Sequence, residues 1–177
     1  MRTRDRALVL ALLSLAGCAS PVTVVSPKLG RAATQDEIAA WDISIPPDGA
    51  GLPAGRGTPA EGARIYAAKC QSCHGDKGAG QPNDRLVGGH GTLASKTPVR
   101  TVGSYWPYAT TVFDYVRRSM PYATPQSLTD DEVYAVTAYI LHANGIIGDA
   151  DEMNARTLPK VKMPNRDNFI VVYPARR

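Results

Sequence analysis

The chain has 177 residues, with 20 Lys and Arg against 16 Asp and Glu, so its formal net charge is +4. This length accommodates one modest domain with appendages and excludes two full-sized domains. The basic residues form no run and no stripe with interleaved aromatic side chains, so the sequence predicts no nucleic-acid site and no nucleic-acid partner.

The first residues have the composition of an export signal. Three arginines precede an apolar run, Ala7–Ala16, that is too short to span a bilayer. A basic head, a short apolar run and small residues follow one another in the order that a secretory signal requires. An N-terminal helix packed on the domain would need no such order, so we expect a signal.

The stretch Leu15–Cys18 (LAGC) resembles the bacterial lipoprotein box. The resemblance implies a lipoprotein signal peptide over residues 1–18, cleaved before Cys18, and acylation of Cys18 as the first mature residue. Two or more acyl chains give stable anchoring. Ala19 in place of Asp favours the outer membrane over the inner one, so the expected location is the periplasmic side of a bacterial membrane. Ordinary cleavage nearby, with Cys18 removed or left as a spare thiol, is the alternative.

Two segments without a long helical pattern come next. Residues 19–33 are a Pro- and Ser-containing tether, which reaches about 3.1 Å per residue if it is extended. Residues 34–58 form an N-terminal arm, in which Thr34 and Glu37 have capping-box spacing ahead of a short helix through Ala40. The rest of this arm is a Pro- and Gly-rich loop.

The domain itself is expected over residues 59–145 and is predicted to be all-α. Its three predicted helices cover residues 59–74, about 111–120 and 129–144. The first and third follow capping boxes, and no Asn-Gly hairpin signal with flanking alternation is present. A C-terminal arm, residues 146–177, has few periodic apolar residues. Roughly ninety residues of helix and glycine-rich loop bury little apolar surface, which favours a large apolar cofactor at the centre.

Two of the three cysteines lie in the stretch Cys70-Gln-Ser-Cys73-His74, whose spacing fits covalent attachment of one haem. Residues i and i+3 of a helical turn face the same side, where both sulfurs can form thioethers with vinyl groups of one porphyrin. His74 projects from that side and can place an imidazole nitrogen on the iron. Gly75 permits a sharp turn away from the macrocycle.

Three other chemistries explain the cysteine pair less well. A structural zinc site needs two more soft ligands, whereas Cys18 lies in the signal and the remaining histidines are scattered. A thioredoxin-type dithiol belongs in a βαβ context, which the pattern lacks. A disulfide between residues i and i+3 of a helix is geometrically awkward and leaves His74 and Gly75 without a role.

The sixth ligand of such a haem should be a soft or imidazole donor well downstream of His74. The candidates are Met120, Met153, Met163, His90 and His142. Met120 follows a helix and precedes Pro121, which stiffens the loop, so we expect Met120 to be the ligand. Met163 is the main alternative on position alone. Met153 lies among charged residues and is expected at the surface, His90 in a loop, and His142 at a helix end, where it serves as a cap charge or a surface group.

Together these features resemble the class I c-type cytochromes. The resemblance is carried by Gly62, Tyr66, the CxxCH stretch 70–74, Met120-Pro121 and Leu128–Tyr139. It implies a small class I cytochrome c fold with extended N- and C-terminal arms, in which the first and last helices cross near the haem at Gly62, Tyr66 and Tyr139. The chain is more closely similar to the cytochrome subunits of bacterial sulfite dehydrogenase and of the sulfur-oxidation (Sox) sulfane dehydrogenase, over about residues 35–175. That similarity is carried by Trp41–Gly49, Thr101–Thr110 (TVGSYWPYAT) and Met163–Arg166.

The closer resemblance implies a non-catalytic electron-transfer subunit with one covalent haem c. In these systems a molybdenum subunit oxidises the sulfur compound and passes single electrons to the cytochrome, which passes them to a downstream cytochrome or oxidase. Ligation by Met120 raises the haem potential, and a six-coordinate iron leaves no place for substrate. Sulfane dehydrogenase cytochromes often carry two haems, whereas this chain has one CxxCH motif. The choice between the two systems therefore stays open.

Two functions from other classes share some of these features. A free-standing lipoprotein carrier that feeds a terminal oxidase has the same fold and the same motifs. A haem sensor or peroxidase would require an open distal site on the iron.

Further candidates come from the segments that carry the closer resemblance. Tyr105 and Trp106 are candidates to donate hydrogen bonds to haem propionates, with Arg100 as a counter-charge. Packing of the two aromatic rings over the cofactor is the alternative. Arg117 and Arg118 are expected to be solvated, or else to attract an acidic partner. The C-terminal arm could pack on its own domain or on a partner.

Overall fold

The computed structural model describes residues 29–170 and 172, so the predicted signal, Cys18 and most of the tether lie outside the described residues. The chain divides into two compact units, Met1–Ile38 and Ala39–Arg177. Among the described residues, no helix is both long enough and apolar enough to cross a membrane.

Helix α2, Gln35–Trp41, begins at the predicted capping box. The Thr34 N–H donates to Glu37 Oε2 (2.8 Å), and the Glu37 N–H donates to Thr34 Oγ1 (3.3 Å). These bonds satisfy N–H groups that the start of a helix leaves without partners. None of the helix residues is buried, so its own cap rather than packing stabilises α2.

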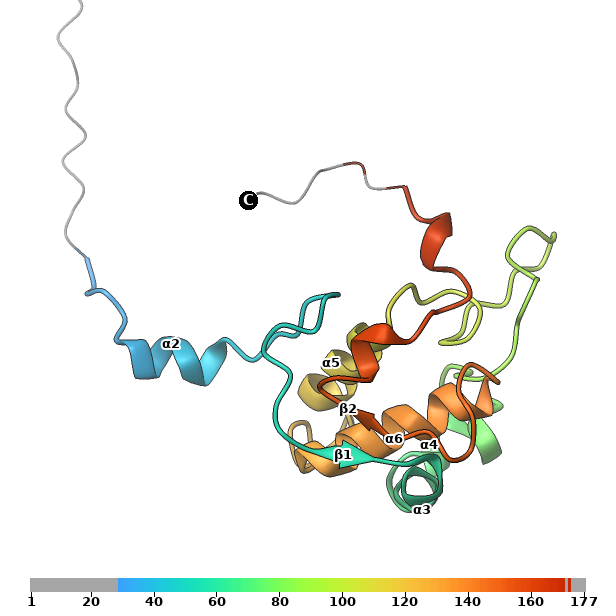
Figure 1. The fold of residues 1–177 in the computed structure, drawn as a ribbon, viewed down its shortest axis with the longest axis horizontal. Helices are drawn as coiled ribbons and strands as arrows, with labels where there is room; N and C mark the ends of the chain where they lie inside the picture. The colour runs from blue at the N-terminus through green and yellow to red at the C-terminus, as the bar shows by residue number, and fades with distance from the viewer. Residues whose placement is uncertain (1–28, 171, 173–177) are drawn as a thin grey trace, which may run out of the picture. The chain divides into compact units, whose positions relative to one another are not determined.

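The second unit is built around two crossing helices, α3 (Pro59–Lys69) and α6 (Asp130–Ala143), which Figure 1 shows. Both begin at the predicted capping boxes. Their close approach depends on Gly62, where a Cβ would lie 1.9 Å from the carbonyl oxygen of Ala135. Any side chain at Gly62 would therefore push the two helices apart.

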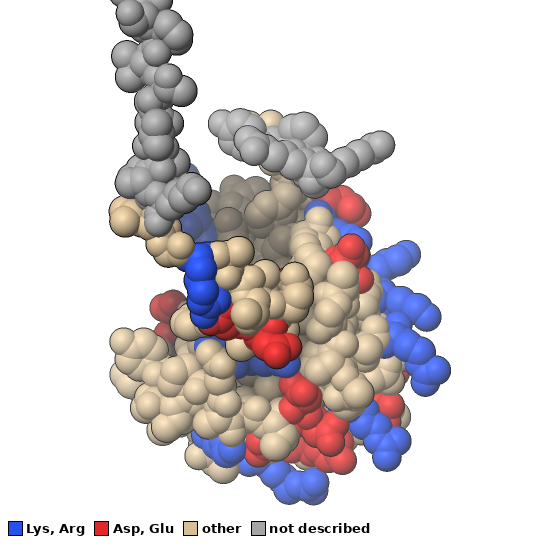
Figure 2. All heavy atoms as spheres, turned by 90° about the vertical axis from the view of Figure 1, so that its left-hand side faces the viewer, with Lys and Arg blue, Asp and Glu red and all other residues tan. Residues whose placement is uncertain are grey.

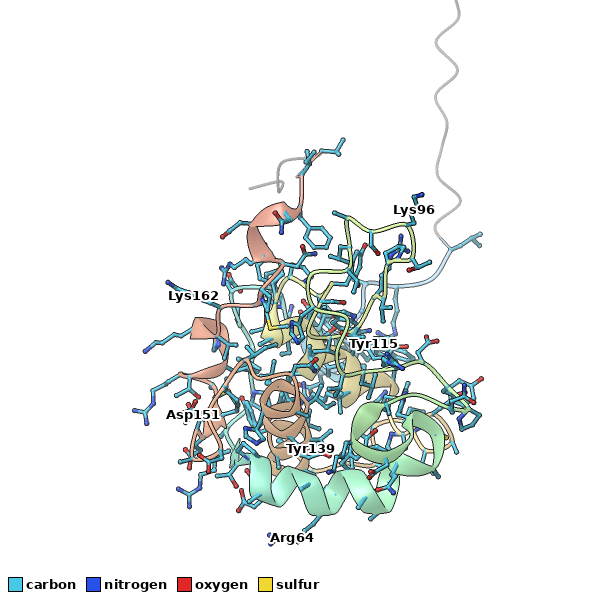
Figure 3. All side chains as sticks on the ribbon, turned by 90° about the vertical axis from the view of Figure 1, so that its right-hand side faces the viewer. Arg64, Lys96, Tyr115, Tyr139, Asp151 and Lys162 are labelled. Atoms are coloured by element: carbon cyan, nitrogen blue, oxygen red, sulfur yellow. The ribbon has the colours of Figure 1, made fainter. Side chains whose placement is uncertain are left out.

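Two tyrosines pack beside this crossing. The ring centroids of Tyr66 and Tyr139 are 4.9 Å apart. Figure 3 shows Tyr139 between α6 and α3, with Arg64 pointing away from the other side of α3. The predicted crossing of the first and last helices through a glycine and two aromatic side chains is confirmed.

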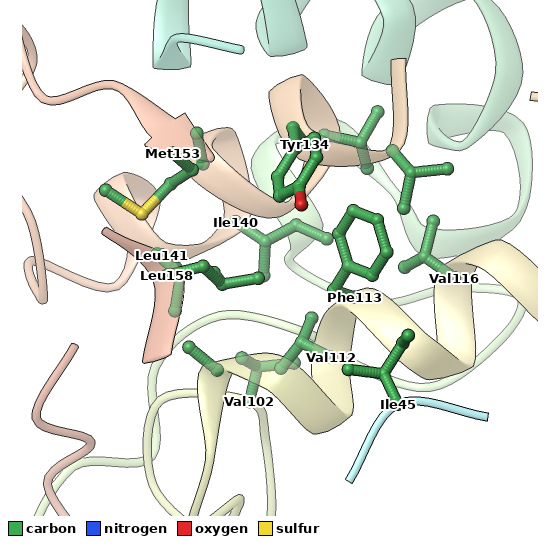
Figure 4. Packing of buried hydrophobic residues seen from close by; sticks show 14 of the residues in the cluster. Ile45, Val102, Val112, Phe113, Val116, Tyr134, Ile140, Leu141, Met153 and Leu158 are labelled. Atoms are coloured by element: carbon green, nitrogen blue, oxygen red, sulfur yellow. The ribbon is translucent and has the colours of Figure 1, made fainter. Parts of the chain in front are cut away.

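Helix α5, Ala109–Ser119, completes the core and starts slightly earlier than predicted. The Phe113 ring packs on the Tyr134 ring of α6 with centroids 4.4 Å apart. Figure 4 shows how apolar side chains from both arms join this contact. The residues that it labels around the two rings are Ile45, Val102, Val112, Val116, Ile140, Leu141, Met153 and Leu158.

A short antiparallel ladder joins the two arms. Strand β1 (Arg56–Gly57) pairs with β2 (Met153–Asn154), with Arg56 opposite Asn154 and Gly57 opposite Met153. The sequence predicted no strand, because each one is only two residues long and its partner lies far away in the chain. Met153, predicted at the surface, is buried (4% exposed). The prediction was wrong because it relied on the charged neighbours of Met153 in the sequence, whereas the ladder places this side chain against the core.

Residues 43–47 of the N-terminal arm lie along one face of α5. Three side chains of that helix bind the arm's backbone at every second residue. Arg117 Nη1 donates to the Ile43 oxygen (3.3 Å), the Ile45 N–H donates to Asp114 Oδ1 (2.8 Å), and Thr110 Oγ1 donates to the Pro47 oxygen (3.0 Å). The spacing works because residues three and four apart share a helix face, whereas alternate residues of an extended chain point the same way.

The C-terminal arm packs on the same unit through apolar side chains. Leu158 (0% exposed) begins the 3₁₀ turn η2, Leu158–Lys160, and Met163 (3% exposed) follows it. A second turn, η3, covers Arg166–Asn168. Beyond it, Ile170 (89% exposed) and Val172 (73% exposed) lie away from the core. This arm is therefore part of the domain's own core at least through Met163.

Candidate haem-binding site

The CxxCH stretch forms a helical turn of its own. Helix α3 ends at Lys69, and α4 covers Gln71–His74, followed by the 3₁₀ turn η1, Asp76–Gly78. The prediction of one continuous helix over residues 59–74 is wrong at Cys70, which lies between the two helices. The N–H groups of Cys73 and His74 both donate to the Cys70 carbonyl (3.1 and 3.0 Å). One turn therefore still holds both cysteines and the histidine together.

The two thiols are free and differ in their surroundings. Cys70 is half-buried and Cys73 is exposed. Burial raises the pKa of the Cys70 thiol to about 11. Reactive dithiols have a lowered thiol pKa, so the raised pKa of Cys70 does not favour a redox-active pair. Among the described residues, no three His, Cys, Asp or Glu side chains cluster as metal ligands.

The imidazole of His74 is oriented by the loop that follows it. Its Nδ1 lies 2.8 Å from the carbonyl oxygen of Asp84. Because a carbonyl only accepts, Nδ1 carries the proton, and the lone pair remains on Nε2. A metal-ligating histidine is commonly held in this way, with one ring nitrogen donating to a carbonyl and the other free to bind. This orientation leaves Nε2 of His74 as the ring nitrogen that is free to bind a metal.

Gly75 turns the chain away after His74, as predicted. Its φ is +75°, and a Cβ there would lie 2.3 Å from the Gly80 oxygen. The Tyr66 hydroxyl donates to the Gly75 carbonyl (3.0 Å), and burial raises the pKa of Tyr66 to about 12. The hydroxyl therefore stays protonated and keeps this turn tied to α3.

The methionines occupy two kinds of position. Met120 follows α5 directly, has an extended backbone (φ −120°, ψ 147°) and is half-buried at the edge of the core. Met153 and Met163 lie inside the hydrophobic core. Unlike Met153 and Met163, Met120 therefore packs against the core with its side chain partly exposed.

The two histidines that follow His74 are not placed alike. His90 is exposed in a loop, as expected. His142 lies in the last turn of α6, half-buried, with Nδ1 3.3 Å from the Ile147 oxygen. This contact with the chain just beyond α6 agrees with the predicted position at a helix end.

Asn144 has a structural role that the sequence analysis missed. It is the last residue of the predicted helix 129–144, and its amide nitrogen donates to the carbonyl oxygens of Leu86 (3.1 Å) and Ile140 (2.9 Å). Its amide oxygen accepts from the Gly88 N–H (3.0 Å). Gly103 faces it so closely that a Cβ would lie 2.1 Å from this oxygen. Asn144 thus fixes the loop after the CxxCH turn to α6, and only its position at a helix end could have signalled that.

The three residues proposed for propionate contacts separate into two groups. The Arg100 guanidinium lies 5.5 Å from the centroid of the Tyr105 ring, and both line a cavity of about 650 Å³ with residues of the C-terminal arm. Among the described residues that line it, Cys70, Cys73, His74 and Met120 do not occur. Trp106 lies elsewhere, with its ring edge-on to Tyr115 at 5.8 Å.

Arg117 and Arg118 are both paired, but Arg118 stays exposed, so the expectation that one or both are solvated holds for Arg118. Arg117 Nε lies 3.1 Å from Asp130 Oδ1, and Arg118 Nη2 lies 2.6 Å from Asp114 Oδ2. Figure 2 shows both basic and acidic side chains on the face that it draws. That face does not carry the single-sign field that would be needed to steer a highly charged partner.

The residues present fit a covalent haem. Two free thiols and an imidazole with a free nitrogen lie in one turn. Several apolar side chains packed on the core are only partly covered, and an apolar cofactor would complete their burial. They include Cys70, Leu86, Trp106, Met120 and Leu128.

Comparisons with known proteins agree with this chemistry. The family model for cytochrome c matches residues 59–144. A chain from the crystal structure of the sulfane dehydrogenase SoxCD from Paracoccus pantotrophus is 44% identical, with a TM-score of 0.77. The match covers 81% of this chain and 71% of that chain. No curated protein gives a significant match.

The sequence motif, the helix crossing and the comparisons lead to one assignment. This chain belongs to the class I c-type cytochromes and resembles the cytochrome subunit of the Sox sulfane dehydrogenase.

Proposed function

We propose that this cytochrome is a single-haem relay that accepts electrons from a molybdenum-containing sulfite or sulfane dehydrogenase subunit. The observation that carries the proposal is the 44% identity, over 81% of the chain, to a chain of a sulfane dehydrogenase. The similarity extends beyond the domain matched by the family model, since residues 59–144 alone could not account for that coverage. A downstream cytochrome or oxidase would take the electrons onward.

The haem would be held by four residues. Cys70 and Cys73 would attach it through thioethers, His74 would bind the iron through Nε2, and Met120 would bind it through sulfur. A haem c bound in this way supplies reversible one-electron transfer. The bond from His74 Nδ1 to the Asp84 oxygen supports the assignment of His74, because it leaves Nε2 unprotonated.

Met120 is preferred to Met163 because of burial. Met163 is part of the apolar core, and moving its sulfur out to a ligand would open a cavity there. Met120 lies at the end of a helix, where the chain is about to enter a loop. Its side chain is already partly exposed and packs against the core from outside.

The proposed location follows from the sequence. Acylation of Cys18 would anchor the mature chain on the periplasmic side of a bacterial membrane, with the outer membrane favoured. The tether would let the domain reach a partner some distance from the lipid. Tyr105, Trp106 and Arg100 stay candidates for propionate contacts.

The experiment is an anaerobic stopped-flow measurement of haem reduction. Purified ferric cytochrome is mixed with sulfite, with and without the cognate molybdenum protein. Fast reduction is expected with the molybdenum protein and negligible reduction without it. If sulfite alone reduced the cytochrome as fast as the pair does, the relay role would fail. If neither sulfite nor a sulfane substrate led to reduction through the molybdenum protein, a free-standing carrier would be favoured.

A further inference from the structure

The loop that carries Met120 is closed at its base by one ion pair. Residues 120–129 connect the end of α5 to the start of α6. Arg117, in the last turn of α5, donates from Nε to Oδ1 of Asp130, the first residue of α6 (3.1 Å). The pair therefore ties the two ends of the loop to each other.

Arg117 has a second partner outside the loop. Its Nη1 donates to the carbonyl oxygen of Ile43 in the N-terminal arm (3.3 Å). Its side chain is only 24% exposed, so solvent competes weakly for these bonds. A guanidinium can hold both partners because its donors form a rigid planar fork, which a lysine lacks. The arm thus helps to fix the arginine that closes the loop.

The first turn of α6 is also tied to the CxxCH turn. Lys69, the residue before Cys70, donates to Glu132 Oε1 (3.1 Å). Met120 in turn is fixed at its backbone, where its N–H donates to the Val116 oxygen (3.0 Å). The start of α6 is therefore connected to the turn proposed to attach the haem and, through Arg117, to the loop that presents Met120.

We propose that Arg117 is a positioning residue that keeps the Met120 loop closed and so keeps the Met120 sulfur on the haem iron. The inference rests on the proposed function, in which Met120 is the sixth ligand. Without the Arg117–Asp130 pair the two loop ends lose this direct side-chain link. The loop then samples more conformations, and the effective concentration of the thioether at the iron falls. An external ligand would then replace Met120 more easily.

Arg118 provides a matched control. It lies in the same turn and also pairs with an aspartate, Asp114, at 2.6 Å. That pair lies within α5, at positions i and i+4, and does not reach the loop or α6. Replacing Arg118 removes the same charge from the same turn and leaves the base of the loop intact.

The test is an imidazole titration of the full-length ferric holoprotein, followed by the weak far-red band of thioether-to-iron charge transfer. Arg117→Gln should lower the apparent imidazole dissociation constant roughly tenfold, as expected for losing one charge-assisted hydrogen bond. Arg118→Gln should stay within about twofold of the parent protein. Asp130→Asn should resemble Arg117→Gln, and the double variant should add little, because both remove one interaction.

Met120→Ala separates failure of this inference from failure of the proposed ligand. If Met120→Ala keeps the far-red band, Met120 is not the ligand and the proposed function is wrong on that point. If the band disappears in Met120→Ala but Arg117→Gln and Arg118→Gln bind imidazole alike, the inference about Arg117 is overturned. It is also overturned if imidazole affinity simply follows the denaturant midpoint across all the variants. Should Arg117→Gln fail to fold, Asp130→Asn decides the matter with the same expected result.

Discussion

The two arms of this cytochrome are held on the same domain by different means. The N-terminal arm is bound mainly through its backbone, by Thr110, Asp114 and Arg117 of α5. The C-terminal arm is bound through apolar side chains, above all Leu158 and Met163, which lie in the core. The N-terminal arm buries Ile45 but is also held by hydrogen bonds to a helix face, whereas the C-terminal arm relies above all on burial of apolar side chains.

Because of this difference, the two arms should respond differently to pH and to substitution. Burial of apolar side chains is insensitive to pH and sequence-specific at the buried positions. Bonds to a backbone tolerate substitution in the arm itself but depend on each side chain of α5 that makes them. The N-terminal arm should therefore weaken at low pH, whereas the C-terminal arm should not.

Leu158→Ala should have the largest effect on stability. Leu158 is completely buried, so the substitution leaves a cavity and should lower the free energy of unfolding by about 2–5 kcal/mol. Chemical denaturation of the holoprotein measures this loss. Ile170→Ala, at an exposed position of the same arm, is the control and should change it by less than about 0.5 kcal/mol. Equal effects at the two positions would mean that the arm is not part of the core.

Met163→Ala should destabilise the protein while leaving the haem ligands in place. The loss should be about 2–5 kcal/mol, because Met163 is almost fully buried in the core. The far-red band should persist in this variant and vanish in Met120→Ala. The reverse pattern would assign the sixth ligand to the C-terminal arm and reduce the contrast between the arms.

Asp114→Asn should loosen the N-terminal arm and lower the free energy of unfolding by about 1–3 kcal/mol. The reason is that it replaces a charged hydrogen-bond acceptor that is mostly buried. Burial raises the pKa of Asp114, but the hydrogen bonds from Arg118 and the Ile45 N–H outweigh it, so the pKa lies below its usual 3.8. A carboxyl whose pKa is lowered in the folded state stabilises the fold above the unfolded pKa. That contribution is lost as pH falls through the folded value. Unfolding measured between pH 7 and pH 2 should show this loss in the parent protein and a smaller one in Asp114→Asn. Identical pH profiles would contradict the assigned role.

Deleting residues from Ile170 onward should have the smallest effect on the isolated domain. Ile170 and Val172 are exposed, so the free energy of unfolding should change by less than about 0.5 kcal/mol. Exposed apolar residues of this kind are common in protein interfaces, so the affinity for the dehydrogenase subunit should fall instead. Calorimetry of the parent and truncated proteins against that subunit checks this. Unchanged affinity would show that the segment has no part in the pairing.

Much of the local structure was determined by sequence. The three capping boxes at Thr34, Thr58 and Thr129 each begin a helix where the spacing predicted one. Gly62 and Gly75 were correctly singled out, because only a residue without a Cβ fits those places. The CxxCH spacing, together with the export signal before it, indicated the cofactor chemistry. The caps and the CxxCH turn could be predicted because each depends on residues within about four positions of one another, whereas Gly62 was singled out through the resemblance to class I cytochromes.

Contacts between distant segments were decided only by the tertiary structure. The two-stranded ladder and the buried Met153 arise from pairing between the arms, and the expected surface position of Met153 was therefore wrong. Arg117 and Arg118 have the same local sequence context, yet one pairs across to α6 and the other within its own helix. Asn144 holds a loop that begins far upstream of it. Local patterns carry the preference of each residue for helix, turn or core, but they do not say which distant partner will satisfy a charge or cover a side chain. Packing settles that choice, because each buried group must find its partner among whatever segments the fold brings beside it.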